Sequence, residues 1–107
     1  MLKIVKFGGS SLADAGQFVK VKNIIEADAN RRYVVPSAPG KRFSGDVKVT
    51  DMLYDCYEKA SAGSDFRDNL IRIRSRYDSI IQELKLSGIS LKDEFTEIEE
   101  HLRTAPH

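Results

Sequence analysis

The order of strand-like and helical segments is the feature that most constrains the fold of this chain. Two short runs of β-branched and aromatic residues, 2–7 and 33–35, have no polar face, which is typical of strands buried on both sides in a parallel sheet. Between them, apolar residues recur every three or four positions, which predicts an amphipathic helix. Residues 2–35 are therefore expected to form a βαβ unit.

Three consecutive helical patterns follow a loop that starts at residue 36. They cover residues 49–63, 66–84 and 90–106, and Gly63 and Gly88 are expected to stop the first two. Two strands and so many helices are an incomplete inventory for an α/β protein, because a two-stranded parallel sheet leaves both edges open. We therefore expect a truncated chain whose missing strands come from further sequence or from another chain.

Capping residues mark the expected helix starts. Ser11 is expected to cap the helix that follows the first strand, since its hydroxyl can accept a hydrogen bond from an orphan backbone N–H, worth about 1 kcal/mol. Ser90 and Asp93 have the spacing of a capping box at the start of the last helix.

Composition excludes several classes of partner. The 17 basic and 16 acidic residues nearly cancel, so no overall field attracts nucleic acid or an anionic membrane. With one cysteine, Cys56, and only His101 and His107 as histidines, the chain has neither an internal disulfide nor enough ligands for a metal site. No apolar run approaches the roughly 18 residues that span a bilayer, and no signal-peptide pattern is present. We expect a soluble, cytoplasmic protein.

Two features of the helical half have structural interpretations. Four arginines, Arg67, Arg72, Arg74 and Arg76, are spread around one helix and diluted by acidic residues, which indicates a solvated, ion-paired face and not a nucleic-acid surface. Cys56 lies on an apolar stripe without a neighbouring base, which favours a core position over a catalytic thiol.

A glycine turn follows the first strand. Adjacent glycines let backbone N–H groups approach an anion, the next helix contributes the positive end of its dipole, and Lys6 can add a full charge. The same residues also suit a plain strand-to-helix turn with Lys6 on the surface.

A second polar segment follows the second strand. Its A-P-G-K stretch is not a Walker P-loop, because Val35 and Arg42 stand where that motif needs Gly and Ser or Thr. Ligands of open parallel sheets bind at the carboxyl ends of strands, where both polar segments are expected. Lys41 and Arg42 either assist ligand binding there or belong to an exposed loop without a ligand.

Three short motifs together resemble the N-terminal part of the aspartate kinases, members of the amino-acid kinase superfamily. They are K-F-G-G-S-S at 6–11, V-V-P-S-A at 34–38 and T-D-M-L at 50–53. The resemblance implies that residues 1–107 are the N-terminal portion of a catalytic domain with an α/β, αβα-sandwich fold, without its nucleotide half and ACT domains. Pro36 departs from the usual apolar residue and is expected at the very end of the strand, because it lacks an N–H donor.

The resemblance also implies two groups of site residues, and the scarcity of cysteine and histidine leaves no metal ligand among them. The phosphoryl group and ATP would be contacted by Lys6, Gly8, Gly9, Ser10 and Ser11. The substrate aspartate would be held by Ser37, Ala38 and Thr50.

The implied reaction is transfer of the γ-phosphate of Mg-ATP to the β-carboxylate of L-aspartate, giving 4-phospho-L-aspartate on the route to lysine, threonine and methionine. A homo-oligomer is expected. Because the family's S-R-G-E segment is absent from these residues, we expect little or no kinase activity from the chain alone.

Two alternatives remain open from the sequence. Glutamate 5-kinase, acetylglutamate kinase and UMP kinase belong to the same superfamily but are disfavoured by Phe7 and the serine pair at residues 10 and 11. A non-catalytic interaction module would use the heptad-like apolar stripe of residues 66–84 to bind a partner helix.

Overall fold

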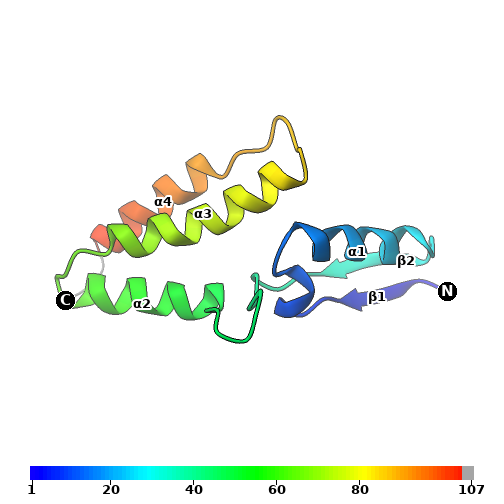
Figure 1. Ribbon diagram of the computed structural model, residues 1–107, viewed down its shortest axis with the longest axis horizontal. Helices are drawn as coiled ribbons and strands as arrows, with labels where there is room; N and C mark the ends of the chain where they lie inside the picture. The colour runs from blue at the N-terminus through cyan, green and yellow to red at the C-terminus, as the bar shows by residue number, and fades with distance from the viewer. Residues whose placement is uncertain (105–107) are drawn as a thin grey trace. The chain divides into compact units, whose positions relative to one another are not determined.

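The structure is a computed structural model that describes residues 1–104. The chain forms two compact units, Met1–Thr50 (unit 1) and Asp51–His107 (unit 2). The elements in chain order (Figure 1) are β1 (Lys3–Lys6), the short 3₁₀ helix η1 (Gly9–Leu12), α1 (Ala15–Glu26), β2 (Arg31–Val35), α2 (Val49–Ser61), α3 (Arg67–Glu83) and α4 (Lys92–Arg103). The predicted α/β class, with a βαβ start followed by consecutive helices, is confirmed.

Unit 1 is a two-stranded parallel sheet with a helix along one face (Figure 1). Its small core joins the end of β1, η1 and α1 through Phe7, Leu12 and Val21. Val5, Phe18 and Ile25 pack against this core and continue it along the sheet and helix. The core is assembled by the apolar spacing that predicted the amphipathic helix.

The composition of the strands predicted burial on both sides, and this prediction is wrong. Ile4 is 75% exposed, Tyr33 57% and Val35 47%. In a parallel pair only one face can lie under α1, so the apolar side chains of the opposite face remain accessible among the described residues. The position of Pro36 is as predicted, since β2 ends at Val35.

The cap of α1 differs from the predicted one. Ser11 lies inside η1, and the side chain of Asp14 instead accepts a hydrogen bond from the N–H of Gln17 at 3.0 Å. The 3₁₀ helix η1 occupies residues 9–12, beginning at the second glycine of the turn. The α-helix therefore begins about one turn later than the apolar pattern indicated.

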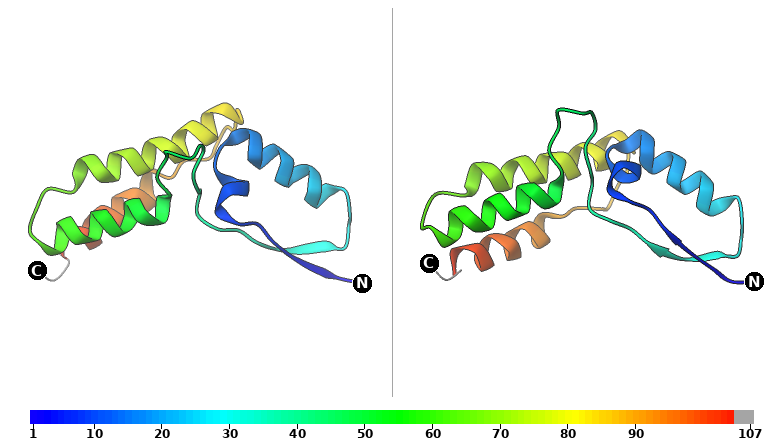
Figure 2. Two further views of the ribbon diagram at one scale, coloured as in Figure 1. Left: turned by 60° about the horizontal axis from the view of Figure 1, so that its bottom comes forward. Right: turned by 90° about the horizontal axis from the view of Figure 1, so that it is seen from below.

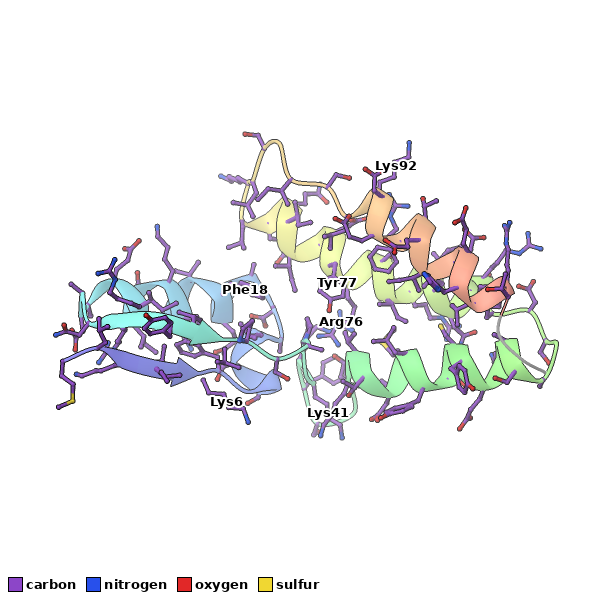
Figure 3. The ribbon with its side chains drawn as sticks, turned by 180° about the vertical axis from the view of Figure 1, so that it is seen from behind. Lys6, Phe18, Lys41, Arg76, Tyr77 and Lys92 are labelled. Carbon is purple, nitrogen blue, oxygen red and sulfur yellow. The ribbon has the colours of Figure 1, made fainter. Side chains whose placement is uncertain are left out.

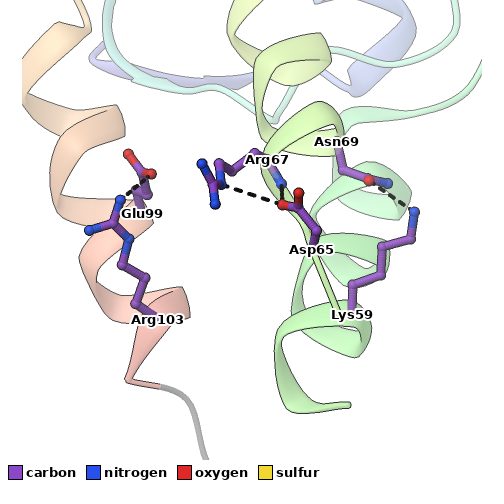
Figure 4. Close-up of polar contacts among 6 residues, drawn as sticks. All are labelled: Lys59, Asp65, Arg67, Asn69, Glu99 and Arg103. Carbon is purple, nitrogen blue, oxygen red and sulfur yellow. Dashed lines mark hydrogen bonds and ion pairs between the residues drawn. The ribbon is translucent and has the colours of Figure 1, made fainter. Parts of the chain in front are cut away.

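Unit 2 consists of three helices that run in alternating directions (Figures 1 and 2). Between α2 and α3, the buried Asn69 accepts a hydrogen bond from Lys59 Nζ at 3.0 Å (Figure 4) and donates one to Asp55. Between α3 and α4, the rings of Tyr77 and Phe95 meet edge to face with centroids 6.1 Å apart. Ion pairs at the surface, such as Arg103 with Glu99 at 2.8 Å (Figure 4), add little to stability.

Two helices end in the same backbone motif with different residues. After α2, Gly63 takes a positive φ of 74°, and the N–H of Ser64 donates to the carbonyl of Lys59 at 2.8 Å. After α3, Lys85 takes a φ of 56°, and the N–H of Leu86 donates to the carbonyl of Ile81 at 3.1 Å. Both are Schellman motifs.

The predicted stops and caps of the later helices are thus correct in part. Gly63 ends α2 as predicted, whereas α3 ends before Gly88, which adopts its positive φ in the following loop. Ser90 forms no capping box, because its hydroxyl accepts from the N–H of Lys92 at 3.2 Å. The end predicted near Pro106 lies outside the described residues.

The stripe on α3 considered for partner binding is largely internal. Phe66, Leu70, Ile73 and Ile80 are buried, with Ile73 only 1% exposed. Arg76 was predicted to be solvated, but it shares this stripe and is 6% exposed. Arg76 follows Ile73 by three positions and precedes Ile80 by four, so it lies on the same side of α3 as these two buried residues.

The interpretation of Cys56 as a core residue is confirmed. Cys56 is fully buried, and this burial raises the pKa of its thiol. His101 is exposed beside Glu97. Within residues 1–104 no helix is both long and apolar enough to cross a membrane.

Candidate functional site

The two polar segments start from adjacent strand ends. Lys6 pairs in register with Val35, and the N–H of Phe7 donates to the Val35 carbonyl at 3.0 Å. The chain then passes through Gly8, whose φ of −75° is open to any residue, into η1. Because the strands are parallel, the segments that leave them lie at the same edge of the sheet.

A close backbone crossing joins these segments. The N–H of Gly40 donates to the carbonyl of Gly9 at 2.8 Å. A methyl group added to Gly40 would lie 2.6 Å from the carbonyl carbon of Gly9 and 2.9 Å from the N of Ser10. Glycine is needed at Gly40 because backbone atoms occupy the space of a side chain.

An open pocket of about 460 Å³ lies at this crossing within unit 1. It is lined by Gly9, Ser10, Ser37, Ala38, Pro39, Gly40, Lys41, Lys48 and Thr50. Three of these residues carry a hydroxyl group and two carry an ammonium group, and no carboxylate-bearing residue of the described part of the chain lines the pocket. Such a set of groups suits an anionic ligand.

The pocket brings together five of the eight site residues named from the sequence. Gly9 and Ser10 come from η1, Ser37 and Ala38 from the segment after β2, and Thr50 from the first turn of α2. Lys6, Gly8 and Ser11 do not line it. Lys6 is exposed at the end of β1, next to the glycine turn (Figure 3).

The structure adds site residues that the sequence analysis missed. Gly40 makes the crossing with Gly9, and Lys48 joins Lys41 in the pocket wall. The glycine of A-P-G-K was a usable signal, since a glycine in a loop at a strand end indicates close backbone approach. The position of Lys48 depends on how the whole loop folds.

The loop also separates the two cations that the sequence analysis grouped. Lys41 lines the pocket, whereas the guanidinium of Arg42 is paired with Asp46, with Nε 2.6 Å from Oδ2. The hydrogen bond from Arg42 is the main reason why the pKa of Asp46 lies far below its usual value of 3.8.

No family model matches the chain. Aspartokinase 3 of Bacillus subtilis (strain 168) is 45% identical to it over 85 residues, which are 79% of this chain and 19% of the relative. The crystal structure of Clostridium acetobutylicum aspartate kinase superimposes with a TM-score of 0.88 at 44% identity, over 94% of this chain and 23% of that one. The chain is an aspartokinase homologue.

Further aspartokinases match over nearly the whole chain. The chloroplastic bifunctional aspartokinase/homoserine dehydrogenase of Daucus carota is 33% identical over 95 residues, 88% of this chain and 9% of the relative. Escherichia coli aspartokinase III, solved with aspartate and ADP, has a TM-score of 0.73 at 27% identity, over 100% of this chain and 24% of that one. The aspartokinase homologue thus spans less than a quarter of each of these relatives.

Proposed function

We propose that this chain supplies the part of an aspartate kinase active site that binds the aspartate substrate and the transferred phosphoryl group. The enzyme would transfer the γ-phosphate of Mg-ATP to the β-carboxylate of L-aspartate in the cytoplasm, in amino-acid biosynthesis. The observation that carries the proposal is the pocket in which the Gly9–Ser10 turn meets Ser37, Ala38 and Thr50. Homology to aspartokinases supports the same substrate class.

The proposed phosphoryl transfer requires a site that stabilises negative charge and aligns the two reactants. A β-carboxylate oxygen of aspartate attacks the γ-phosphorus, a new O–P bond forms, and the bond from phosphorus to the bridging oxygen of ADP breaks. No proton is transferred, because the attacking carboxylate is already ionised. The chain must therefore neutralise the negative charge of the two reactants and hold them in line.

The residues at the strand ends suit these tasks. In the proposal, the backbone N–H groups of Gly8 and Gly9 and the hydroxyl of Ser10 contact the transferred group, and the Lys6 ammonium neutralises its charge. Ser11, within the same 3₁₀ turn, belongs to the ATP-binding group.

Aspartate would be held on the opposite side of the pocket. The hydroxyls of Ser37 and Thr50 can donate to a carboxylate, and the small Ala38 leaves room for the substrate. Since no carboxylate of residues 1–104 lines the pocket, Mg²⁺ would enter as part of the nucleotide substrate. Groups for the adenine are expected from regions of an aspartokinase outside this chain, and a homo-oligomer remains a prediction.

Hydroxylamine trapping of aspartyl phosphate tests the proposal. The assay is run with Mg-ATP and L-aspartate on this chain and on the longest product that its natural reading frame encodes. We expect turnover by the longer product, little or none by the 107 residues alone, and a loss of at least about 100-fold in kcat for Lys6→Met.

The matched control is Lys20→Met, which removes an exposed lysine from α1 and should leave turnover unchanged. If no product of the reading frame forms aspartyl phosphate, the kinase proposal is wrong. If Lys6→Met and Lys20→Met turn over equally fast, the role proposed for Lys6 is wrong.

A further inference from the structure

The loop between β2 and α2 carries three cations that the proposed reaction leaves without a role. Lys41 and Lys48 line the pocket, and Lys41 is labelled in Figure 3. The third cation, Arg42, is not among the lining residues and is bound to a carboxylate of the same loop. The three positive charges therefore have two different roles.

Arg42 and Asp46 close the loop on itself. The backbone N–H of Arg42 donates to Oδ2 of Asp46 at 3.0 Å, while its guanidinium donates through Nε to Oδ2 at 2.6 Å and through Nη2 to Oδ1 at 3.0 Å. The N–H of Asp46 in turn donates to the carbonyl of Phe43 at 3.0 Å. We call the Arg42–Asp46 pair the clasp. Its bidentate geometry and the 9% exposure of the Asp46 side chain make it a well-ordered ion pair.

Both ends of the loop are anchored by backbone hydrogen bonds. Gly40 donates to the carbonyl of Gly9 at 2.8 Å, and the N–H of Val49 donates to the carbonyl of Pro39 at 3.0 Å. Lys41 directly follows the first anchor, and Lys48 directly precedes the second. The two anchors and the clasp therefore limit where the two lysine stems can leave the backbone.

The clasp also decides which charges remain available to a ligand. Asp46 is the only acidic residue between positions 36 and 50. Because Asp46 is paired with Arg42, it does not form an ion pair with either lysine of the loop. Within residues 1–104, neither Lys41 nor Lys48 is paired with a carboxylate. Two lysines without a carboxylate partner thus line a pocket that also contains three hydroxyl-bearing residues.

We propose that Lys41 and Lys48 bind an anionic group of the ligand in this pocket, a carboxylate or a phosphoryl group, and that the clasp positions them and keeps Asp46 from neutralising them. This inference deepens the proposed function and rests on it for the identity of the natural ligand. Lys41 and Lys48 are binding residues, whereas Arg42 and Asp46 act through them.

Binding of two small anions to the 107-residue chain tests the inference. Inorganic phosphate and L-aspartate are titrated separately while the backbone amide signals of Gly9, Ser10 and Thr50 are followed by NMR. We expect the double variant Lys41→Met/Lys48→Met to bind phosphate about tenfold more weakly than the unaltered chain. The control Lys20→Met/Lys22→Met loses the same charge from α1 and should keep the original affinity.

The clasp is tested by breaking and rebuilding it. Arg42→Gln should weaken phosphate binding several-fold, because Asp46 becomes free to pair with a lysine. Exchanging the two residues, Arg42→Asp with Asp46→Arg, restores an ion pair of opposite direction and should recover most of the affinity. If Arg42 served only the folding of the loop, replacing it would not change the salt dependence of phosphate binding. Because we propose that it acts through the lysine charges, Arg42→Gln should reduce that salt dependence.

The outcomes separate this inference from the proposed function. Failure of the unaltered chain to bind either anion, or equal affinities of the two double-lysine variants for both anions, overturns the inference. Phosphate binding through the lysines without any binding of L-aspartate supports the inference and overturns the proposal that Ser37, Ala38 and Thr50 hold aspartate on this chain. Equal binding of L-aspartate by both double variants, with phosphate binding weakened only by Lys41→Met/Lys48→Met, assigns the two lysines to a phosphoryl group and leaves the proposed function standing.

Discussion

Replacing Gly40 by alanine should disrupt the crossing on which the pocket is built. The new Cβ would lie 2.6 Å from the carbonyl carbon of Gly9 and 2.9 Å from its oxygen, against the 3.4–4 Å of ordinary contact. Both partners are backbone atoms, so no side chain can swing away, and restoring an ordinary contact to the Gly9 carbonyl carbon requires one segment to move by about 0.8 Å. The hydrogen bond from Gly40 to Gly9, now 2.8 Å, would be stretched by that movement.

The expected cost follows from three contributions. Overpacking of this kind costs about 1–3 kcal/mol, and the weakened hydrogen bond about 1 kcal/mol. Alanine reduces the entropy of the unfolded chain, which returns about 0.4–1 kcal/mol. The net destabilisation of unit 1 should therefore be about 1–3.5 kcal/mol, which at an m-value of about 1.5 kcal/mol/M lowers the urea midpoint by roughly 0.7–2.3 M.

Urea unfolding followed at the amide signals of β1 and α1 measures this cost, and two other glycines calibrate it. At Gly9 the nearest atoms to an added Cβ are at 3.2 Å, so Gly9→Ala should cost less than Gly40→Ala. At Gly45, in the same loop, the nearest atom is a Phe43 ring carbon at 3.7 Å, so Gly45→Ala should be close to neutral. Equal midpoints for Gly40→Ala and Gly45→Ala would refute the reasoning.

Three further predictions concern caps and charge. Lys85→Gly should raise the unfolding free energy by about 1 kcal/mol in urea titrations, since glycine lacks the Cβ that opposes the positive φ of 56°; an unchanged value would contradict this. Asp14→Ala should lower stability by about 1 kcal/mol, measured by circular dichroism in urea, whereas Ser11→Ala should have little effect because Ser11 is not the cap. Folding lowers the pKa of Asp46 below its ordinary value of 3.8. The ion pair with Arg42 therefore stabilises the loop fully at pH values above 3.8, and this stabilisation is lost as the pH falls below 3.8 toward the folded-state pKa. Asp46→Asn should abolish that part of the acid transition in a pH titration of unit 1, and an identical acid transition would argue against the clasp.

Much of the site could be anticipated from local sequence. A glycine turn after each of two parallel strands places both segments at one edge of the sheet, whatever the rest of the chain does. This rule alone brings Ser10 and Ser37 into one pocket. Proline at position 36 likewise had to stand where the strand ends, because it cannot donate to a neighbouring strand.

Features that depend on chain segments meeting at long range could not be anticipated. The need for glycine at Gly40 arises from the Gly9 carbonyl, thirty-one positions earlier in the sequence, and no local pattern records that approach. The choice of Asp14 over Ser11 as a cap followed from the 3₁₀ turn that the chain makes on leaving the strand. Arg76 is buried on α3 although its charge predicted a surface position.

The sequence by itself determined the kinds of element, their order and the polar segments at the strand ends, because periodicity and turn residues act over a few neighbouring positions. The tertiary structure alone decided which charges of the basic loop are available to a ligand. Lys41 and Arg42 are adjacent and equally charged, yet one lines the pocket and the other binds Asp46. That difference comes from how the loop is anchored and closed, which is a property of the folded backbone.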